Sequence, residues 1–131
     1  MVINSGDTTW MMVSTGLVML MTPALGFFES GFIRSKNALS VIMQTFSGLG
    51  ILSILWILVG FSLVFAPSYE GIIGNLSWIA FNNVPIYTSL EYAPTIPGIS
   101  FASFQMMFAV ITPLLITGAF AEKMKWSSFL I

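Results

Sequence analysis

Long uncharged stretches alternate with short polar segments along this chain of 131 residues. Three stretches, of 21, 33 and 30 residues, contain no Asp, Glu, Lys or Arg. A helix needs about 20 apolar residues to cross the hydrocarbon core of a bilayer, so each stretch is long enough to span it. We therefore predict membrane-spanning helices at about 8–30, 38–66 and 98–121, and the start of a fourth at about 126.

The composition agrees with this pattern. The chain is 56% hydrophobic and 7% charged, with a mean hydropathy of +0.94. Soluble domains carry about 25% charged residues, so an ordinary soluble domain is excluded. The predicted fold class is an all-α integral membrane protein, in which residues 1–131 form one part of a single membrane domain.

The residue types that are missing restrict the chemistry of this segment. It has no Cys and no His, which removes thiolate metal ligands, the commonest metal ligand and the commonest general base. We therefore expect no enzymatic activity, no cofactor and no metal site. The net charge of −1 and the lack of a basic run argue against nucleic acid as a partner and leave the lipid bilayer as the expected surroundings.

Charge placement predicts the orientation in the membrane. All four cationic residues, Arg34, Lys36, Lys123 and Lys125, fall in two short turns at 29–37 and 122–126. Positive residues favour the cytoplasmic side of a cell membrane. We therefore expect both turns in the cytoplasm, and the N-terminus and residues 67–97 outside.

The segment 67–97 separates the second and third predicted spans. It holds four of the six prolines and no Lys or Arg, which is typical of an exposed loop. We expect a loop with one amphipathic turn at about 76–81.

Polar and small residues near the first span have simple structural interpretations. Thr22, Gly26 and Ser30 recur every four residues and favour close helix packing, within the subunit or between subunits. Asp7 is expected to cap the first helix, and Glu29 and Glu122 to be solvated charges at the interface. Pro23 and Pro113 each remove a backbone donor, so we expect bends near Met19 and Ala109.

The third predicted span contains the candidate site. Phe104 and Phe108 are four residues apart on one helix face, and Gln105 lies beside them. Entering from outside at Gly98, the two rings lie roughly 9 Å and roughly 15 Å below the entrance. One interpretation is ordinary core or lipid contact; the other is a hydrophobic constriction whose π faces attract a small cation.

Several short motifs follow one another along the chain. They are 7–15 (DTTWMMVST), 20–24 (LMTPA), 34–37 (RSKN), 43–44 (MQ), 55–56 (LW), 104–109 (FQMMFA), 111–113 (ITP) and 118–122 (GAFAE). Their order resembles the N-terminal third of the ammonium transporter family (Amt/Mep/Rh). Two places depart from the pattern. After the first span, where many bacterial members have an aromatic residue followed by Gly-Gly, this chain has Phe28-Glu29-Ser30-Gly31, and Lys123 replaces an Arg.

The resemblance implies a specific architecture and site. Members are homotrimers, and each subunit encloses its own pore within about eleven helices arranged as two inverted halves. Phe104 and Phe108 resemble the paired ring gate at the floor of the outer vestibule. Phe104 would also contribute to ammonium recruitment, and Gln105 would line the neighbouring wall. The pore histidines, the recruiting Trp and the conserved Asp of the family belong to later helices.

The function implied by the resemblance is transmembrane transport of ammonium or ammonia by a protein of which this chain is an N-terminal fragment. A PII-type cytoplasmic regulator is an implied partner. Two alternatives stay open: an ammonium sensor built on the same membrane domain, and a structural membrane subunit in which both Phe rings belong to the core.

Overall fold

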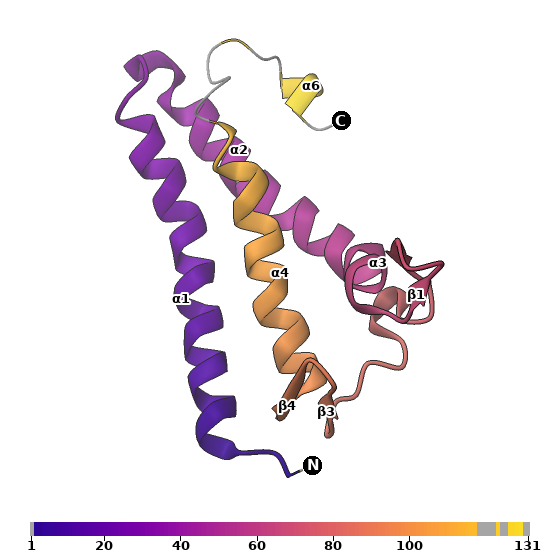
Figure 1. Cartoon of the computed structure of the whole chain (residues 1–131). Coiled ribbons are helices and arrows are strands. Elements are labelled where there is room, and N and C mark those ends of the chain that lie inside the picture. Colours follow the sequence, from indigo (N-terminus) through magenta and orange to yellow (C-terminus); the bar gives the residue numbers. More distant parts are fainter. Residues whose placement is uncertain (1, 118–122, 124–125, 130–131) are drawn as a thin grey trace.

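The computed structural model describes residues 2–117, 123 and 126–129. Three long helical segments lie side by side, and each contacts the other two (Figure 1). The N-terminus and the second hairpin of the long connection (residues 89–97) lie at one end of this bundle, the first hairpin (residues 68–74) lies at its side next to α3, and the turn after the first helix lies at the other end. The helices are α1 (Ser5–Ser30), α2 (Ser35–Leu55), α3 (Phe61–Phe65), α4 (Gly98–Leu114) and α6 (Trp126–Phe129).

Helix α1 begins one turn earlier than the sequence suggested. The side-chain oxygen of Asn4 accepts hydrogen bonds from the backbone N–H groups of Gly6 (2.8 Å) and Asp7 (3.2 Å). Asn4 is therefore the N-cap, and the prediction that Asp7 caps the helix is wrong. Asp7 lies in the first turn instead, where a carboxylate is favoured by the helix dipole. The helix then continues through Pro23 to Ser30.

The second predicted span is one continuous helical segment with an irregular turn. Helix α2 passes into a π-helical turn, η1 (Trp56–Gly60), and then into α3, so the segment runs from Ser35 to Phe65. A π-helical turn widens the helix and shifts the direction of the side chains that follow it. Here the indole N–H of Trp56 donates a hydrogen bond of 3.2 Å to the carbonyl of Ala102 on α4.

The connection between α3 and α4 contains more regular structure than the predicted loop. Strand β1 (Ser68–Tyr69) pairs antiparallel with β2 (Ile73–Gly74), and β3 (Ser89–Leu90) pairs antiparallel with β4 (Ala93–Pro97). A short 3₁₀ turn, η2 (Ile79–Phe81), lies where the amphipathic turn was expected. The protein is mostly helical, as predicted, and two small hairpins replace part of the predicted loop. They satisfy backbone groups that a plain loop would leave to water.

An aromatic cluster holds this connection against the helices. Phe61 is fully buried and contacts Phe65, Trp78, Phe81 and Phe101 with ring centroids 5.3–6.5 Å apart. The hydroxyl of Ser62 donates to the carbonyl of Asn75 (2.7 Å) and accepts from the N–H of Trp78 (3.1 Å). The end of the bundle beside the hairpins is thus a packed core.

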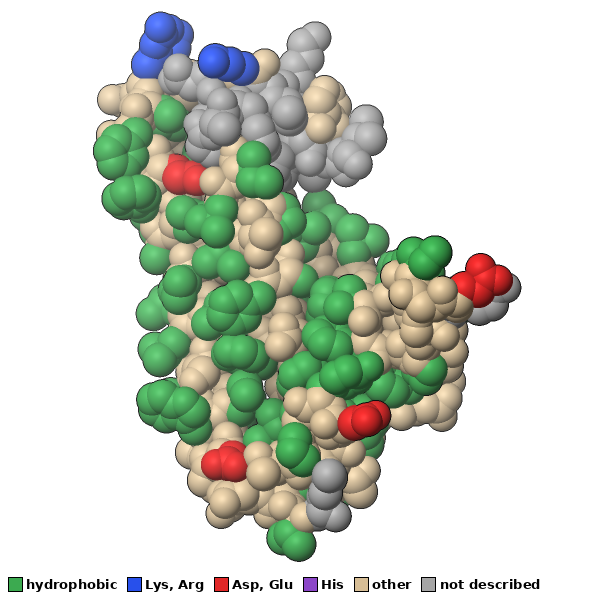
Figure 2. Space-filling view, in the orientation of Figure 1, with side chains coloured by type: hydrophobic (Ala, Val, Ile, Leu, Met, Phe, Trp, Pro, Cys, Tyr) green, Lys and Arg blue, Asp and Glu red, His purple; other side chains and the backbone are tan. Residues whose placement is uncertain are grey.

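The helices have the surface expected for a bilayer. Both Ser5–Ser30 and Ser35–Phe65 are long and apolar enough to cross a membrane. Helix α4 is 17 residues long and ends at Leu114, and residues 118–121 of the predicted third span lie outside the described residues. Hydrophobic side chains cover the length of the bundle, and Lys and Arg side chains gather at the end that holds the α1–α2 turn (Figure 2).

The stripe of small residues on α1 mediates contact within the chain. Thr22 and Gly26 are buried, and Gly26 faces Thr45 of α2. Of the two possibilities left open by the sequence, packing inside one subunit is therefore the one observed for Gly26.

Candidate functional site

A groove of about 370 Å³ follows the face of α4 on which the predicted site residues lie. Its walls come from two segments that are far apart in the sequence, the η1–α3 region and α4. It is lined by Trp56, Val64, Phe65, Gln105, Phe108, Ala109, Thr112 and Pro113. The structure therefore brings Gln105 and Phe108 into one groove, while Phe104 lies beside it in contact with Phe108.

The two Phe rings touch as their spacing predicts. Their centroids are 5.1 Å apart, with an angle of 62° between the ring planes. The arrangement is therefore edge to face, and the rings are not stacked flat. An edge-to-face pair places the electropositive edge of one ring against the electronegative face of the other, which stabilises the contact by about 0.5–1.5 kcal/mol. Phe104 is half-buried and Phe108 is 45% exposed on the groove side.

Trp56 is the wall residue that sequence reasoning missed. Its side chain lines the groove, and its hydrogen bond to Ala102 fixes the distance between η1 and α4. An indole N–H inside an apolar stretch needs an acceptor, because no water is present in the hydrocarbon region. That requirement was a signal that Trp56 faces another helix, although it could not identify Ala102 as the partner.

Polar groups in the groove are few and uncharged. Gln105 contributes an amide, and the Thr112 hydroxyl donates a hydrogen bond of 2.7 Å to the carbonyl of Phe108. None of the eight lining residues titrates near neutral pH. The groove therefore offers aromatic faces and dipoles to a ligand, and it has no carboxylate to hold a bare cation at this depth.

Pro113 and Ala109 both line this groove. Because Pro113 has no N–H, it cannot complete the backbone hydrogen bond to the carbonyl of Ala109. Helix α4 nevertheless continues to Leu114, supported by contacts with α1 and α2. The proline thus leaves the carbonyl of Ala109 without this helical donor and does not end the helix.

The other ends of α1 and α4 are joined by a polar contact. The Thr117 hydroxyl lies 2.6 Å from the Oε2 atom of Glu29 and 2.6 Å from the carbonyl of Leu114. Thr117 is buried and Glu29 is half-buried. The expectation that Glu29 is a solvated charge is therefore wrong, because the end of α4 packs beside the last turn of α1. Glu122 lies outside the described residues.

Solved structures of other proteins resemble this arrangement of helices and hairpins. The structure of Mep2 from Candida albicans matches 98% of the chain with a TM-score of 0.84 and 30% sequence identity, and the chain covers 28% of that structure. A structure described as "Sensor Amt Protein" matches with a TM-score of 0.79 and 30% identity, over 95% of the chain and 29% of that structure. The fold is thus that of one segment of a multi-pass membrane protein.

Sequence comparison identifies the family. The model of the Ammonium Transporter Family matches residues 9–131. Ammonium transporter 1 of Dictyostelium discoideum is 51% identical over 97% of the chain, and the ammonium transporter of Bacillus subtilis is 46% identical over 96%. The chain belongs to the ammonium transporter family, as its motifs suggested. It spans 27% and 31% of the length of these two relatives.

Proposed function

We propose that this chain forms the N-terminal part of a channel or transporter that moves ammonium or ammonia across a cell membrane. The observation that carries the proposal is the groove on α4, where Gln105 and Phe108 meet Trp56 and Phe65. Phe104 and Phe108 form the ring gate in this proposal, and Gln105 lines the wall next to it. Later helices of the full-length protein complete the pore, and three subunits assemble as a homotrimer.

The chemistry of the groove supports passage of a small, weakly hydrated species. A cation over the face of a Phe ring gains about 0.5–2 kcal/mol, whereas burying an unpaired charge in hydrocarbon costs several times more. The groove therefore suits brief recruitment of ammonium at its outer end, followed by passage in the neutral form. The proton acceptor belongs to other helices, because no lining residue of the groove titrates near neutral pH.

Orientation is part of the proposal. The described cations lie at the end with the α1–α2 turn, and the N-terminus and the β3–β4 hairpin lie at the opposite end (Figures 1 and 2). With the cationic end in the cytoplasm, the groove opens toward the outside above Phe108. A PII-type regulator would then bind on the cytoplasmic side.

Truncation of the exposed ring tests the gate. Phe108→Ala in the full-length protein should raise the apparent KM for methylammonium by about 2- to 30-fold, which is the loss of one cation–π contact. Uptake of radiolabelled methylammonium by cells that express each variant at equal levels measures the effect.

Phe46→Ala is the matched control for this experiment, because Phe46 is similarly exposed (49%) but lies on α2 outside the groove. Native mass spectrometry should give the same oligomer for both variants. Equal uptake kinetics in the Phe108→Ala and Phe46→Ala proteins would contradict the gate and favour a purely structural role for the rings.

A sensor is the second candidate, favoured by the similarity to the structure described as "Sensor Amt Protein". In a sensor the same groove binds ammonium, and the outcome is a signal from a cytoplasmic domain. Methylammonium binding without measurable uptake in proteoliposomes would favour the sensor over the transporter.

A further inference from the structure

A second hollow lies at the hairpin end of the bundle, separate from the groove. It has a volume of about 350 Å³, and α1, β4 and α4 all contribute to its walls. Its lining combines one carboxylate with three aromatic rings. The lining residues are Asp7, Trp10, Met11, Tyr92, Ala93, Thr95, Ile96 and Phe101.

We propose that this hollow binds ammonium-type cations, meaning ammonium itself or a substituted ammonium group. Among the described residues that line the hollow, Asp7 is the only acidic or basic one. Arg34 and Lys36 lie in the α1–α2 turn at the opposite end of the molecule (Figure 1). Within the described part of the chain, the carboxylate of Asp7 has neither a hydrogen bond nor an ion pair. A cation entering the hollow would neutralise it.

The aromatic walls select the type of cation. Trp10 and Tyr92 are 72% and 58% exposed, and aromatic rings of this kind attract a cation of low hydration energy. The remaining lining residues are mostly apolar. A strongly hydrated ion such as Na⁺ would lose its water without replacement ligands. An ammonium group instead donates hydrogen bonds to Asp7 and places any methyl groups against the rings.

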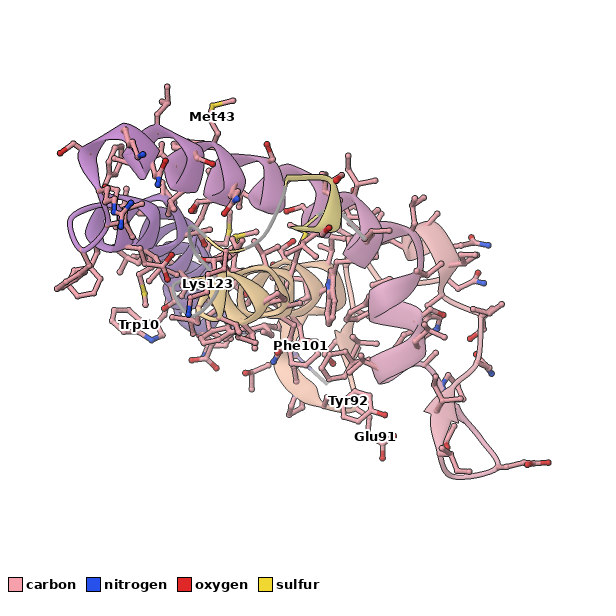
Figure 3. The ribbon with its side chains drawn as sticks, turned by 90° about the horizontal axis from the view of Figure 1, so that it is seen from above. Trp10, Met43, Glu91, Tyr92, Phe101 and Lys123 are labelled. Atoms are coloured by element: carbon pink, nitrogen blue, oxygen red, sulfur yellow. The ribbon has the colours of Figure 1, made fainter. Side chains whose placement is uncertain are left out.

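The walls are held in place before any ligand binds. Phe101 is 9% exposed, and Tyr92 stacks on it with an angle of 15° between the ring planes (Figure 3). The backbone N–H of Asn4 donates a hydrogen bond of 2.8 Å to the carbonyl of Thr95, which ties the start of α1 to β4. The backbone that carries Asp7 is thereby joined to the hairpin that carries Thr95, which lowers the cost of ordering the site on binding.

One pair of rings separates the hollow from the groove. Phe65 lines the groove, Phe101 lines the hollow, and their centroids are 5.0 Å apart. The hollow therefore lies next to the proposed transport groove, on the side of the hairpins. The inference rests on the proposed function only in the choice of ammonium as ligand, because carboxylate and rings are observed independently of it.

A local probe tests the proposal. The full-length protein is labelled with 5-fluorotryptophan in phosphatidylglycerol nanodiscs, and the Trp10 fluorine resonance is assigned by its absence from the Trp10→Phe variant. Methylammonium chloride should shift this resonance saturably, whereas sodium chloride at equal ionic strength should not. Asp7→Asn should weaken the apparent affinity by at least about tenfold, because it removes a charged hydrogen-bond acceptor.

Glu91→Gln is the matched control. This substitution also removes one carboxylate, next to Tyr92 in the sequence, but Glu91 is not among the residues that line the hollow. Equal titrations of Asp7→Asn and Glu91→Gln, or an equal response to sodium, would overturn the proposal. Phe108→Ala should leave the shift of the Trp10 resonance unchanged. Altered uptake in Phe108→Ala therefore tests the gate, whereas a lost Trp10 shift in Asp7→Asn tests the hollow.

The ammonium group has two sources, the solution and the headgroup of a lipid. Replacing phosphatidylglycerol by phosphatidylethanolamine in the nanodiscs distinguishes them. If the headgroup amine is the occupant, the lipid alone should shift the Trp10 resonance in the wild type and not in Asp7→Asn. If dissolved ammonium is the occupant, the two lipids should give the same methylammonium titration.

Discussion

At the scale of single residues, one hydroxyl group joins two helices at the end opposite the hairpins. Thr117 carries one hydroxyl proton and has two oxygen atoms 2.6 Å away, one on Glu29 and one on Leu114. A hydroxyl that only bonded its own helix would donate to Leu114. The contact with Glu29 means that Thr117 links the segment after α4 to the last turn of α1.

Thr117→Val should therefore destabilise the protein. Valine keeps the shape and removes the donor, which leaves the half-buried carboxylate of Glu29 without this partner. The free energy of unfolding of the full-length protein in detergent should fall by about 0.5–2 kcal/mol. Thr9→Val is the control, because the exposed Thr9 hydroxyl bonds the Ser5 carbonyl of its own helix. An equal fall in the free energy of unfolding in Thr9→Val and Thr117→Val would contradict a stabilising link between Thr117 and Glu29.

Residue-scale prediction from the sequence succeeded where the partner is local. Phe104 and Phe108 are four apart, so helical periodicity alone places their rings in contact, as observed. Trp56 and Glu29 were not predicted as paired residues. Their partners, Ala102 and Thr117, are 46 and 88 positions away, and no local rule connects residues at such separations.

At the scale of elements, the contact between α1 and α2 depends on a missing side chain. A Cβ atom at Gly26 would lie 2.6 Å from Oγ1 of Thr45 and 2.9 Å from its Cβ. Thr45 is buried, and its hydroxyl donates to the carbonyl of Val41 at 3.0 Å, so it has no free space to rotate into. The helices approach this closely because position 26 is Gly.

Gly26→Ala should push α1 away from α2 and lower the free energy of unfolding by about 1–3 kcal/mol. Gly16→Ala on the same helix meets no atom within 4 Å, so it should be neutral or stabilise by up to about 1 kcal/mol through helix propensity. Unfolding of both variants by denaturant in detergent measures the difference. Equal stability of the two would show that close packing at Gly26 contributes nothing.

At the scale of the whole molecule, cationic side chains gather at one end of the bundle. Figure 2 shows Lys and Arg side chains at this end, whereas Asp and Glu side chains are spread along the molecule. An asymmetry of this kind orients a membrane protein during insertion, because cationic turns are retained in the cytoplasm.

Cysteine labelling of intact cells checks the predicted orientation. In a full-length protein whose other cysteines are replaced by Ser, Glu70→Cys should react with a membrane-impermeant maleimide in intact cells. Lys36→Cys should react only after the cells are permeabilised. Labelling of Lys36→Cys from the medium would reverse the orientation and place the groove opening and the aromatic hollow on the cytoplasmic side.

The sequence by itself determined the helices, the cationic turns and the family, because all of these depend on local order: runs without charge, residues four apart, and short motifs in sequence. Only the tertiary structure decided that Trp56 forms a wall of the groove, that Glu29 is hydrogen-bonded, and that Asp7, Tyr92 and Phe101 line one hollow. The physical reason is that these contacts are set by how three helices and a hairpin pack together. Each helix can present several faces, and packing against the other elements selects one of them.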